Sequence, residues 1–304
     1  MYLEHFGFNE YPFTLTPDTS YFLASNHHQA ALNTLLVAVH TGEGFIKITG
    51  EVGTGKTLLC RQFLTQIDSI NATRTQPQFV TAYIPNPYLT PHSLMLSLAD
   101  ELGIPLAPGV DQHQLLKTIT NALMAFADKG RQVILCLDEA QAMPTETLEA
   151  LRLLTNLETE KRKLLQIVLF GQPELDQKLQ HHNIRQLNQR ISFHYQLGTL
   201  NRSELEQYIE HRLKIAGYLG RPIFTRRAIA ALHTASQGIP RLINILAHKS
   251  LMLSFGTGEH RIGPRQIGVA ADDTEAAHKI RHPWPYFAIA VIILATVIGW
   301  GILK

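Results

Sequence analysis

The sequence predicts an α/β fold: a parallel sheet with helices on both faces, then a small all-helical lid domain and a C-terminal transmembrane helix. Between residues 25 and 199, β-rich apolar runs alternate with helical patterns, which is typical of such a sheet. The strand signal then stops, and the chain ends in a long uncharged apolar run. Hydrophobic residues make up 45% of the 304 residues and charged residues 17%, which excludes a mainly disordered protein.

The first 24 residues are rich in aromatic residues and prolines and are expected to form an irregular arm. Ser25 or Asn26 can cap a helix over about 27–40. Residues 25–199 are expected to form the core domain. Its strands are predicted at Phe45–Thr49, Phe79–Ile84, Val133–Leu137, Leu165–Phe170 and Ile191–Leu197. Its further helices are predicted near 56–69, 91–102, 112–128 and 145–158.

The second domain is predicted to be all-helical. Asn201 followed by Glu204 matches a capping box, which indicates a helix that begins at about residue 202. Residues 200–265 are expected to form a small lid, and residues 266–285 a linker. The lid helices are predicted near 202–216, 226–236 and 241–254.

The end of the chain predicts a membrane helix. Residues 286–303 are 18 residues without a charge, and a helix of that length covers about 27 Å, close to the hydrocarbon core of a bilayer. Lys279 and Arg281 precede the segment and only Lys304 follows it, so the positive-inside rule puts residues 1–282 in the cytoplasm. The alternative is a buried helix of a soluble domain.

A phosphate-binding loop is the first chemical signature. Residues 50–57 read GEVGTGKT and match the pattern G-x-x-x-x-G-K-[ST] after a predicted strand and at the start of a predicted helix. Lys56 would reach the β- and γ-phosphates of ATP, and the Thr57 hydroxyl would hold Mg²⁺. The expected nucleotide-binding residues of this P-loop are Gly50, Glu51, Val52, Gly53, Thr54, Gly55, Lys56 and Thr57. A glycine-rich turn with a surface lysine is the alternative.

Two carboxylates, Asp138 and Glu139, follow a predicted apolar strand. Carboxylates at the end of a buried strand are costly unless they meet a cation or hydrogen-bond donors. Asp138 is expected to bind Mg²⁺ through water, and Glu139 to polarise the attacking water, which indicates an ATP hydrolase. The alternative is a capping pair for the helix after Pro144.

Further polar residues are candidates for the same site. Gln172 follows the strand Leu165–Phe170 and could bond the γ-phosphate or its water. Arg190, or else Arg185, could reach the γ-phosphate of a neighbouring subunit. Arg241 lies at a helix start after Pro240 and could close onto the phosphates as the helical domain moves. For each, the alternative is an ordinary turn or surface side chain.

The cysteines and histidines indicate no further site. Cys60 and Cys136 are interpreted as small core residues, and no Cys/His spacing predicts a zinc site. The pairs His27-His28 and His181-His182 are interpreted as surface or capping residues.

Together these residues resemble the AAA+ ATPases over about residues 1–265. More narrowly, the chain resembles the ExeA/GspA-type general secretion ATPases and, closest among them, the MSHA pilus-biogenesis ATPases of the MshM type. The matching stretches are residues 6–8, 12–13, 15–18, 50–57, 138–141, 169–175 and 186–191. The resemblance implies sensor roles for Gln172 and Arg241, and a finger acting in trans for Arg190.

The resemblance also implies a homo-oligomeric ring in the bacterial inner membrane. It implies work on an envelope-spanning machine, and we expect pilus or secretion assembly proteins and a cell-wall-binding protein as partners. Two function classes remain. One is a membrane-anchored ATPase for assembly of a type IV pilus or a type II secretion complex. The other is a nucleic-acid-handling AAA+ ATPase, such as a transposition helper or an origin-type protein.

Charge bears on the second class. Residues 181–265 carry 12 Lys and Arg against 4 Asp and Glu, which could suit DNA phosphates. However, no winged-helix or aromatic–basic patch is evident, and a terminal membrane helix fits DNA work poorly. A P-loop kinase is a weaker third possibility, because Glu139 favours water as the acceptor.

Overall fold

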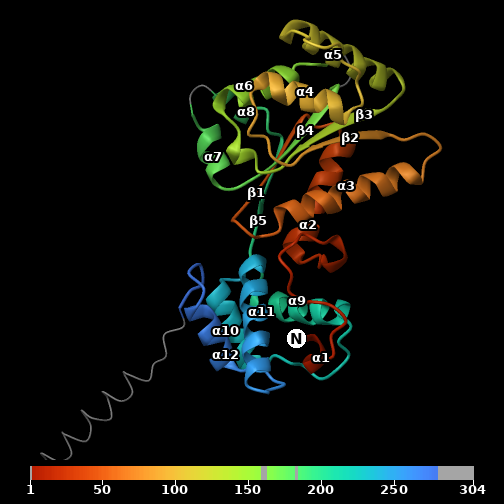
Figure 1. Ribbon diagram of the computed structural model, residues 1–304. Helices are drawn as coiled ribbons and strands as arrows, with labels where there is room; N and C mark the ends of the chain where they lie inside the picture. Colours follow the sequence, from red (N-terminus) through yellow and green to blue (C-terminus); the bar gives the residue numbers. More distant parts are fainter. Residues whose placement is uncertain (1, 159–162, 182–183, 280–304) are drawn as a thin grey trace, which may run out of the picture.

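A parallel sheet and a group of helices make up the protein. The computed structural model describes residues 2–158, 163–181 and 184–279. The sheet has five strands in the order β2-β3-β4-β1-β5, all parallel (Figure 1). The strands are β1 Phe45–Gly50, β2 Phe79–Ile84, β3 Gln132–Leu137, β4 Leu165–Gly171 and β5 Phe193–Leu197. The prediction of alternating strands and helices is therefore confirmed, with β5 beginning two residues later than expected.

Helices cover both faces of this sheet. One face packs against α2 (Asn26–His40) and α3 (Lys56–Ala72), and the other against α4 (Pro91–Glu101), α5 (Gln112–Asp128) and α6 (Thr145–Leu154). Strand β3 contributes side chains to the apolar clusters on both faces of the sheet, because successive side chains of a strand point to opposite faces. Leu135 and Leu137 belong to the cluster with α4–α6, whereas Ile134 and Cys136 belong to the cluster with α2 and α3. The short helices α7 (Glu174–Leu179) and α8 (Arg185–Asn188) lie between β4 and β5 in the sequence.

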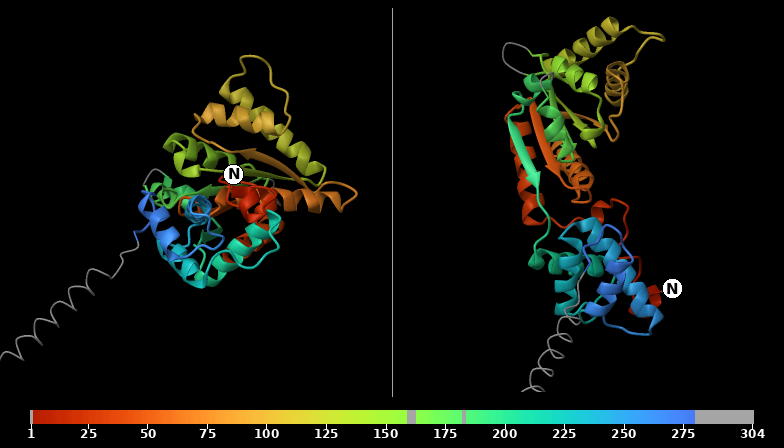
Figure 2. Two further views of the ribbon diagram at one scale, coloured as in Figure 1. Left: turned by 60° about the horizontal axis from the view of Figure 1, so that its bottom comes forward. Right: turned by 90° about the vertical axis from the view of Figure 1, so that its left-hand side faces the viewer.

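The lid is a separate helical body below the sheet. Figure 2 (right) shows the two bodies one above the other, joined by the segment that leaves β5. The lid helices are α9 (Arg202–Ile215), α10 (Arg226–Ser236), α11 (Pro240–Gly256) and α12 (Pro264–Asp272). The capping box at Asn201 and Glu204 is present, as predicted: Asn201 accepts from the Glu204 backbone N–H at 3.0 Å, and Glu204 accepts from that of Asn201 at 2.9 Å.

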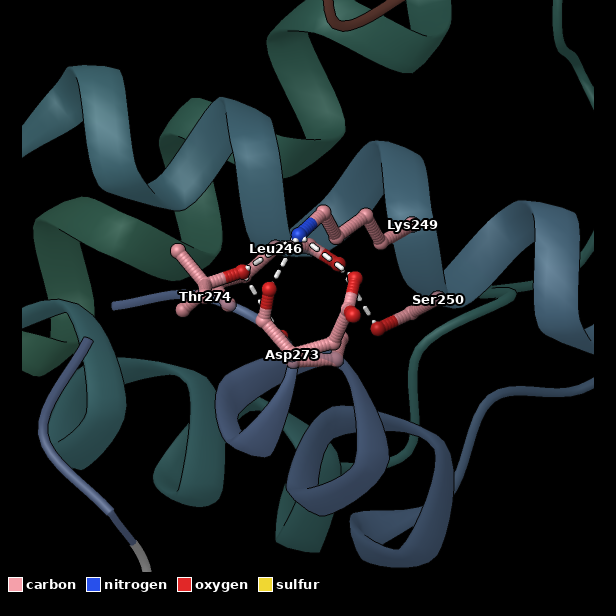
Figure 3. A network of polar contacts seen from close by, with 6 residues as sticks. Leu246, Lys249, Ser250, Asp273 and Thr274 are labelled. Carbon is pink, nitrogen blue, oxygen red and sulfur yellow. Dashed lines mark hydrogen bonds and ion pairs between the residues drawn. The ribbon is translucent and has the colours of Figure 1, made fainter. Parts of the chain in front are cut away.

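Helix α12 occupies the first part of the predicted linker. Residues 264–272 form a helix whose Ile267, Ala270 and Ala271 are buried against the lid core, so the predicted linker at 266–285 is wrong over this stretch. Lys249 on α11 holds the end of α12 (Figure 3). Its Nζ donates to the carbonyl oxygen and a carboxylate oxygen of Asp273, at 2.9 and 2.8 Å, and to Thr274 Oγ1 at 2.8 Å. A cation there stabilises the free carbonyls at the end of a helix.

The arm is more ordered than expected. It begins with a short helix, α1 (Tyr2–Phe6), which lies beside the lid although it is distant from it in sequence (Figure 1). Phe6, Phe8 and Phe13 are buried in the same apolar cluster as α9–α12. The aromatic residues that suggested an irregular arm therefore complete the lid core.

The predicted transmembrane segment, residues 286–303, lies outside the described residues. Over residues 2–158, 163–181 and 184–279, no helix combines the length and the apolar character needed to cross a membrane.

Candidate nucleotide-binding site

The phosphate loop, residues 50–57, connects β1 to α3. Gly53 and Gly55 both have left-handed backbones, with φ of 82° and 98°, which L-residues with side chains rarely adopt. Space is also restricted: a Cβ at Gly53 would lie 2.6 Å from Arg241 Cβ, and one at Gly55 would lie 2.9 Å from His28 Nε2. Thr54 is buried and its hydroxyl donates to the carbonyl oxygen of Glu51 at 2.8 Å. The loop is therefore held by its own bonds and by two neighbouring elements.

Lys56 lies across this loop. Its Nζ donates to the carbonyl oxygens of Gly50 and Glu51, at 2.7 and 2.9 Å. Burial lowers the pKa of Lys56, and the nearby carboxylates of Glu139 and Asp138 oppose this shift. The hydrogen-bond partners of the ammonium are neutral carbonyl oxygens. An anionic phosphate accepts stronger hydrogen bonds than these and could replace them.

Asp138 and Thr57, the two predicted Mg²⁺ ligands, come together from different elements. Asp138 follows β3, is buried, and accepts from the Glu139 backbone N–H at 3.0 Å. Burial raises the pKa of Asp138, while hydrogen bonds from Thr57 and from that N–H lower it. A hydroxyl and a carboxylate are oxygen ligands of the kind that Mg²⁺ prefers, so the pair fits the metal that the sequence predicts.

Glu139 and Gln172 are also in contact. Glu139 has φ of 52°, a left-handed conformation that is uncommon for a residue other than glycine and is frequent at functional sites. Gln172 Nε2 donates to Glu139 Oε2 at 3.1 Å, and Gln141 Nε2 donates to the same oxygen. The sequence reasoning missed Gln141, although it lies within the run 138–141 on which the family resemblance partly rests.

A cavity of about 380 Å³ joins these residues to the arm and the lid. It lies among the phosphate loop, Glu139, Gln172, the start of α11 and the second half of α9. Arg241, at the start of α11, lines it, and its backbone N–H donates to Gly53 O at 3.1 Å. The remaining lining residues are Thr14, Leu15, Thr16, Pro17 and Asp18 of the arm, Val52, Gly53, Gly55, Lys56, Thr57 and Leu58 of the core, and Tyr208, Arg212, Pro240 and Asn244 of the lid.

The arm wall of the cavity was not predicted. Arg212 is buried, its Nε donates to Pro12 O at 2.6 Å, and its guanidinium carbon lies 4.5 Å from the ring centroid of Tyr21. Asn244 Nδ2 donates to Thr14 O at 3.3 Å. One lid arginine and one lid asparagine thus fix the arm where it borders the cavity.

The interpretation of His28 as a surface residue is wrong. His28 is buried, and its Nε2 lies 3.1 Å from Thr54 O in the phosphate loop. A carbonyl oxygen can only accept, so Nε2 carries the hydrogen and Nδ1 accepts from Ser25 Oγ at 2.7 Å. Burial lowers the pKa of His28. Ser25 caps α2, as predicted, but His28 is not a surface residue.

The two arginines proposed as fingers lie away from the cavity of their own chain. Arg190 Nη1 donates to Thr155 Oγ1 at 2.8 Å, at the end of α6. Arg185 is exposed at the start of α8. Neither residue lines the cavity. Their action on a neighbouring subunit stays a prediction.

Comparisons with known proteins agree with this geometry. Residues 39–179 match the AAA domain family. The chain is 41% identical over 271 residues to general secretion pathway protein A of Aeromonas hydrophila. The match covers 89% of this chain and 48% of that protein, so the chain spans about half the length of the curated relative it matches.

Solved structures show the same fold at low identity. The ORC2 protein of Aeropyrum pernix has a TM-score of 0.63 at 16% identity, over 88% of this chain and 73% of that one. Cdc6p of Pyrobaculum aerophilum has a TM-score of 0.64 at 16% identity, over 84% and 70%. The RuvB branch migration motor of Thermotoga maritima has 0.54 at 14% identity, over 87% and 73%.

The AAA domain match includes the phosphate loop and the two carboxylates after β3. The 41% identity extends over most of the core and the lid together. A nucleotide-binding cavity with these residues is what such a protein requires, and the chain belongs to the ExeA/GspA-type family of AAA+ proteins.

Proposed function

We propose that the chain is a membrane-anchored ATPase that couples ATP hydrolysis to assembly of a type II secretion complex or of a type IV pilus of the MSHA type. The proposal of hydrolysis rests on Glu139, because this residue lines the same cavity as the phosphate loop and its carboxylate accepts a hydrogen bond from Gln172. The secretion part is supported by the relative named general secretion pathway protein A. Ring assembly and a cell-wall-binding partner belong to the same proposal.

The roles follow from the contacts. Lys56 would exchange its carbonyl partners for phosphate oxygens, and Thr57 and Asp138 would hold Mg²⁺, which neutralises charge on the phosphates. Glu139 would accept a hydrogen bond from the attacking water and polarise it. Gln172 would bond the γ-phosphate or the water, because its amide reaches the same carboxylate.

The lid supplies the remaining contact of the same subunit. The backbone N–H of Arg241 already bonds to the phosphate loop, so a small movement of α11 would bring the guanidinium to the phosphates. Arg190 would act on the nucleotide of the neighbouring subunit, because it lies away from the cavity of its own chain.

The test of hydrolysis is Glu139→Gln. The variant keeps the shape of the side chain and the Thr57–Asp138 pair but loses the charge that polarises water. We expect ATP binding to be retained and turnover to fall by about 10²- to 10⁴-fold. Lys56→Ala is expected instead to weaken nucleotide binding. Turnover of Glu139→Gln at the wild-type rate would show that another residue activates the water.

The membrane anchor has its own test. Residues 286–303 carry no charge over a length that matches a bilayer. Full-length protein is expected to stay with the inner membrane after a carbonate wash, whereas a chain ending at residue 282 should be released. Recovery of the full-length chain in the wash supernatant would support the buried-helix alternative.

DNA handling is the second candidate. The structural neighbours include an ORC1 protein in complex with DNA, and the lid exposes several arginines, among them Arg221, Arg226, Arg227 and Arg265. Duplex binding by the chain ending at residue 282, weakening steeply with salt, would favour this candidate. Binding that is absent at low salt would favour the assembly ATPase.

A further inference from the structure

Gln141 connects the ends of two strands at the candidate site. It lies in the short helix η2 (Ala140–Ala142) that follows β3. Its Nε2 donates to Glu139 Oε2, and its Oε1 accepts from the backbone N–H of Gln172, just beyond β4, at 3.0 Å. Gln172 Nε2 donates to the same Glu139 oxygen at 3.1 Å. The three residues form a closed ring of hydrogen bonds.

The backbone of Gln141 is held as well. Lys178 on α7 donates from Nζ to the carbonyl oxygens of Gln141 and Met143, the latter at 3.1 Å. Helix α7 is itself fixed to β1 by an ion pair between Asp176 and the buried Lys47. The backbone of Gln141 is therefore fixed by β3, which precedes it, and through α7 by β1. Its side-chain oxygen is fixed by the Gln172 N–H at the end of β4.

This arrangement restricts the Glu139 carboxylate. Oε2 accepts from two amides, and bonds to a charged acceptor are about twice as strong as bonds between neutral groups. Among the described residues, none donates to Oε1, and Glu139 lines the cavity. One carboxylate oxygen is anchored and the other is left for a ligand or water. If Gln141 only joined the ends of β3 and β4, its bond to the Gln172 backbone would be enough. The second bond, to Glu139, indicates a further role.

We infer that Gln141 is a positioning residue, which fixes the carboxylate of Glu139 and couples its orientation to Gln172. The inference rests on the proposed hydrolysis of ATP at this site. If Gln172 moves when the γ-phosphate arrives or leaves, the Gln141 amide transmits that movement to Glu139. Gln141 does not touch the reacting atoms and acts only through these two residues.

Two substitutions test this role in the full-length, detergent-solubilised protein. Gln141→Leu keeps the size but removes both side-chain bonds. We expect kcat to fall by about 10- to 100-fold with KM for ATP nearly unchanged, since a misplacement of about 1 Å has an effect of this size. Gln141→Glu keeps an acceptor oxygen for the Gln172 N–H but replaces the donor to Glu139 with a like charge. Its kcat should therefore fall at least as far as that of Gln141→Leu, although the bond to the Gln172 backbone can still form.

Gln177→Glu is the matched control. Gln177 is an exposed glutamine on α7, and its substitution makes the same change of charge near the site without touching Glu139. Its kcat and KM for ATP should equal those of the wild type. Wild-type kcat in both Gln141 variants, with the wild type active, would overturn the inference.

A measurement without turnover separates the inference from the proposed function. In Gln141→Leu, the Gln172 N–H loses its acceptor, so amide hydrogen exchange should quicken in peptides covering 138–143 and 170–175, while α5 stays unchanged. If the wild type hydrolyses no ATP, the proposed function fails, and the exchange data alone decide whether Gln141 holds the two segments together. Unchanged exchange in these peptides would contradict its role.

Discussion

Lys56 and Asp138 are buried groups of opposite charge. Burial lowers the pKa of Lys56 and raises the pKa of Asp138, so it favours the neutral form of each. The charge of Lys56 is partly compensated by two carbonyl oxygens and the nearby carboxylates of Glu139 and Asp138. The charge of Asp138 is partly compensated by Thr57, one backbone N–H and Lys56. Buried charge that is incompletely compensated lowers the stability of a folded protein. Bound phosphates would complete the compensation of Lys56, and Mg²⁺ that of Asp138.

His28 makes the stability of the phosphate loop depend on pH. Burial lowers the pKa of His28 below its ordinary value of 6.5. Near and below pH 6.5 the unfolded chain therefore binds more protons than the folded one, so the free energy of unfolding decreases as the pH is lowered. The contribution of neutral His28 is complete above about pH 6.5 and is lost as the pH falls through the folded pKa.

We predict that His28→Gln reduces this acid sensitivity. A glutamine amide can still donate to Thr54 O but does not titrate near neutral pH. The thermal midpoint should drop less between about pH 8 and about pH 5.5 in the variant than in the wild type. His92→Gln, which changes a histidine on α4, serves as the control. Equal acid sensitivity of the wild type and His28→Gln would mean that the pKa of His28 does not differ between the folded and unfolded protein, which would contradict the prediction.

Sequence position decides which site residues could be predicted. Lys56, Asp138, Glu139 and Gln172 each follow a strand within a short, recognisable run. His28 bonds to a residue 26 positions away, and Arg212 to one 200 positions away. Their roles arise only from tertiary contacts, so no local pattern indicates them.

At the scale of elements, apolar runs predicted the strands well because each central strand is buried on both faces, as in β4 with all seven residues buried. Helix α12 was missed because its apolar residues are few and small, and glycine interrupts them. It becomes a helix through its packing on α10 and α11, a tertiary effect that propensity does not contain.

The arm and the lid depend on Arg212. Its guanidinium donates to two arm carbonyls, of Pro12 at 2.6 Å and of Thr14 at 3.5 Å, and to Tyr208 Oη at 3.0 Å. We predict that Arg212→Met, which keeps much of the apolar stem, destabilises the protein by about 2 kcal/mol, because bonds to a charged donor are lost. The arm should then detach from the cavity and ATP should bind more weakly.

Limited proteolysis and nucleotide titration check this prediction. Cleavage within residues 12–24 should quicken in Arg212→Met, and the dissociation constant for ATP should rise. Arg202→Met, an exposed arginine of the same helix, should leave both unchanged. An arm that stays protected in Arg212→Met would mean that the aromatic residues alone hold it on the lid.

At the scale of the whole molecule, the cavity depends on three parts of the chain that are distant in sequence. The core supplies the phosphate loop, Glu139 and Gln172, the arm supplies one wall, and the lid supplies Arg241. The two candidate fingers, Arg190 and Arg185, do not line this cavity. Arg190 instead bonds to Thr155 at the end of α6, where a single chain gives it no role with nucleotide.

In the proposed ring, a head-to-tail contact would bring Arg190 of one subunit to the cavity of the next. We predict that Arg190→Ala keeps ATP binding and loses turnover by about 10³- to 10⁵-fold, the range for fingers supplied in trans. Thr155→Val removes the same local hydrogen bond but keeps the arginine, so it should stay active.

Mixing two inactive variants tests the shared site directly. Arg190→Ala subunits keep Glu139 and the phosphate loop, whereas Glu139→Gln subunits keep Arg190 and, by binding ATP, should still assemble. In random rings of equal parts, about a quarter of the interfaces join a sound cavity to a sound finger. Because each inactive interface is slower by orders of magnitude, even this share should restore activity visibly above both parents. If mixed oligomers form and no ratio restores turnover, Arg190 does not act across the interface, and Arg185→Ala is mixed in the same way.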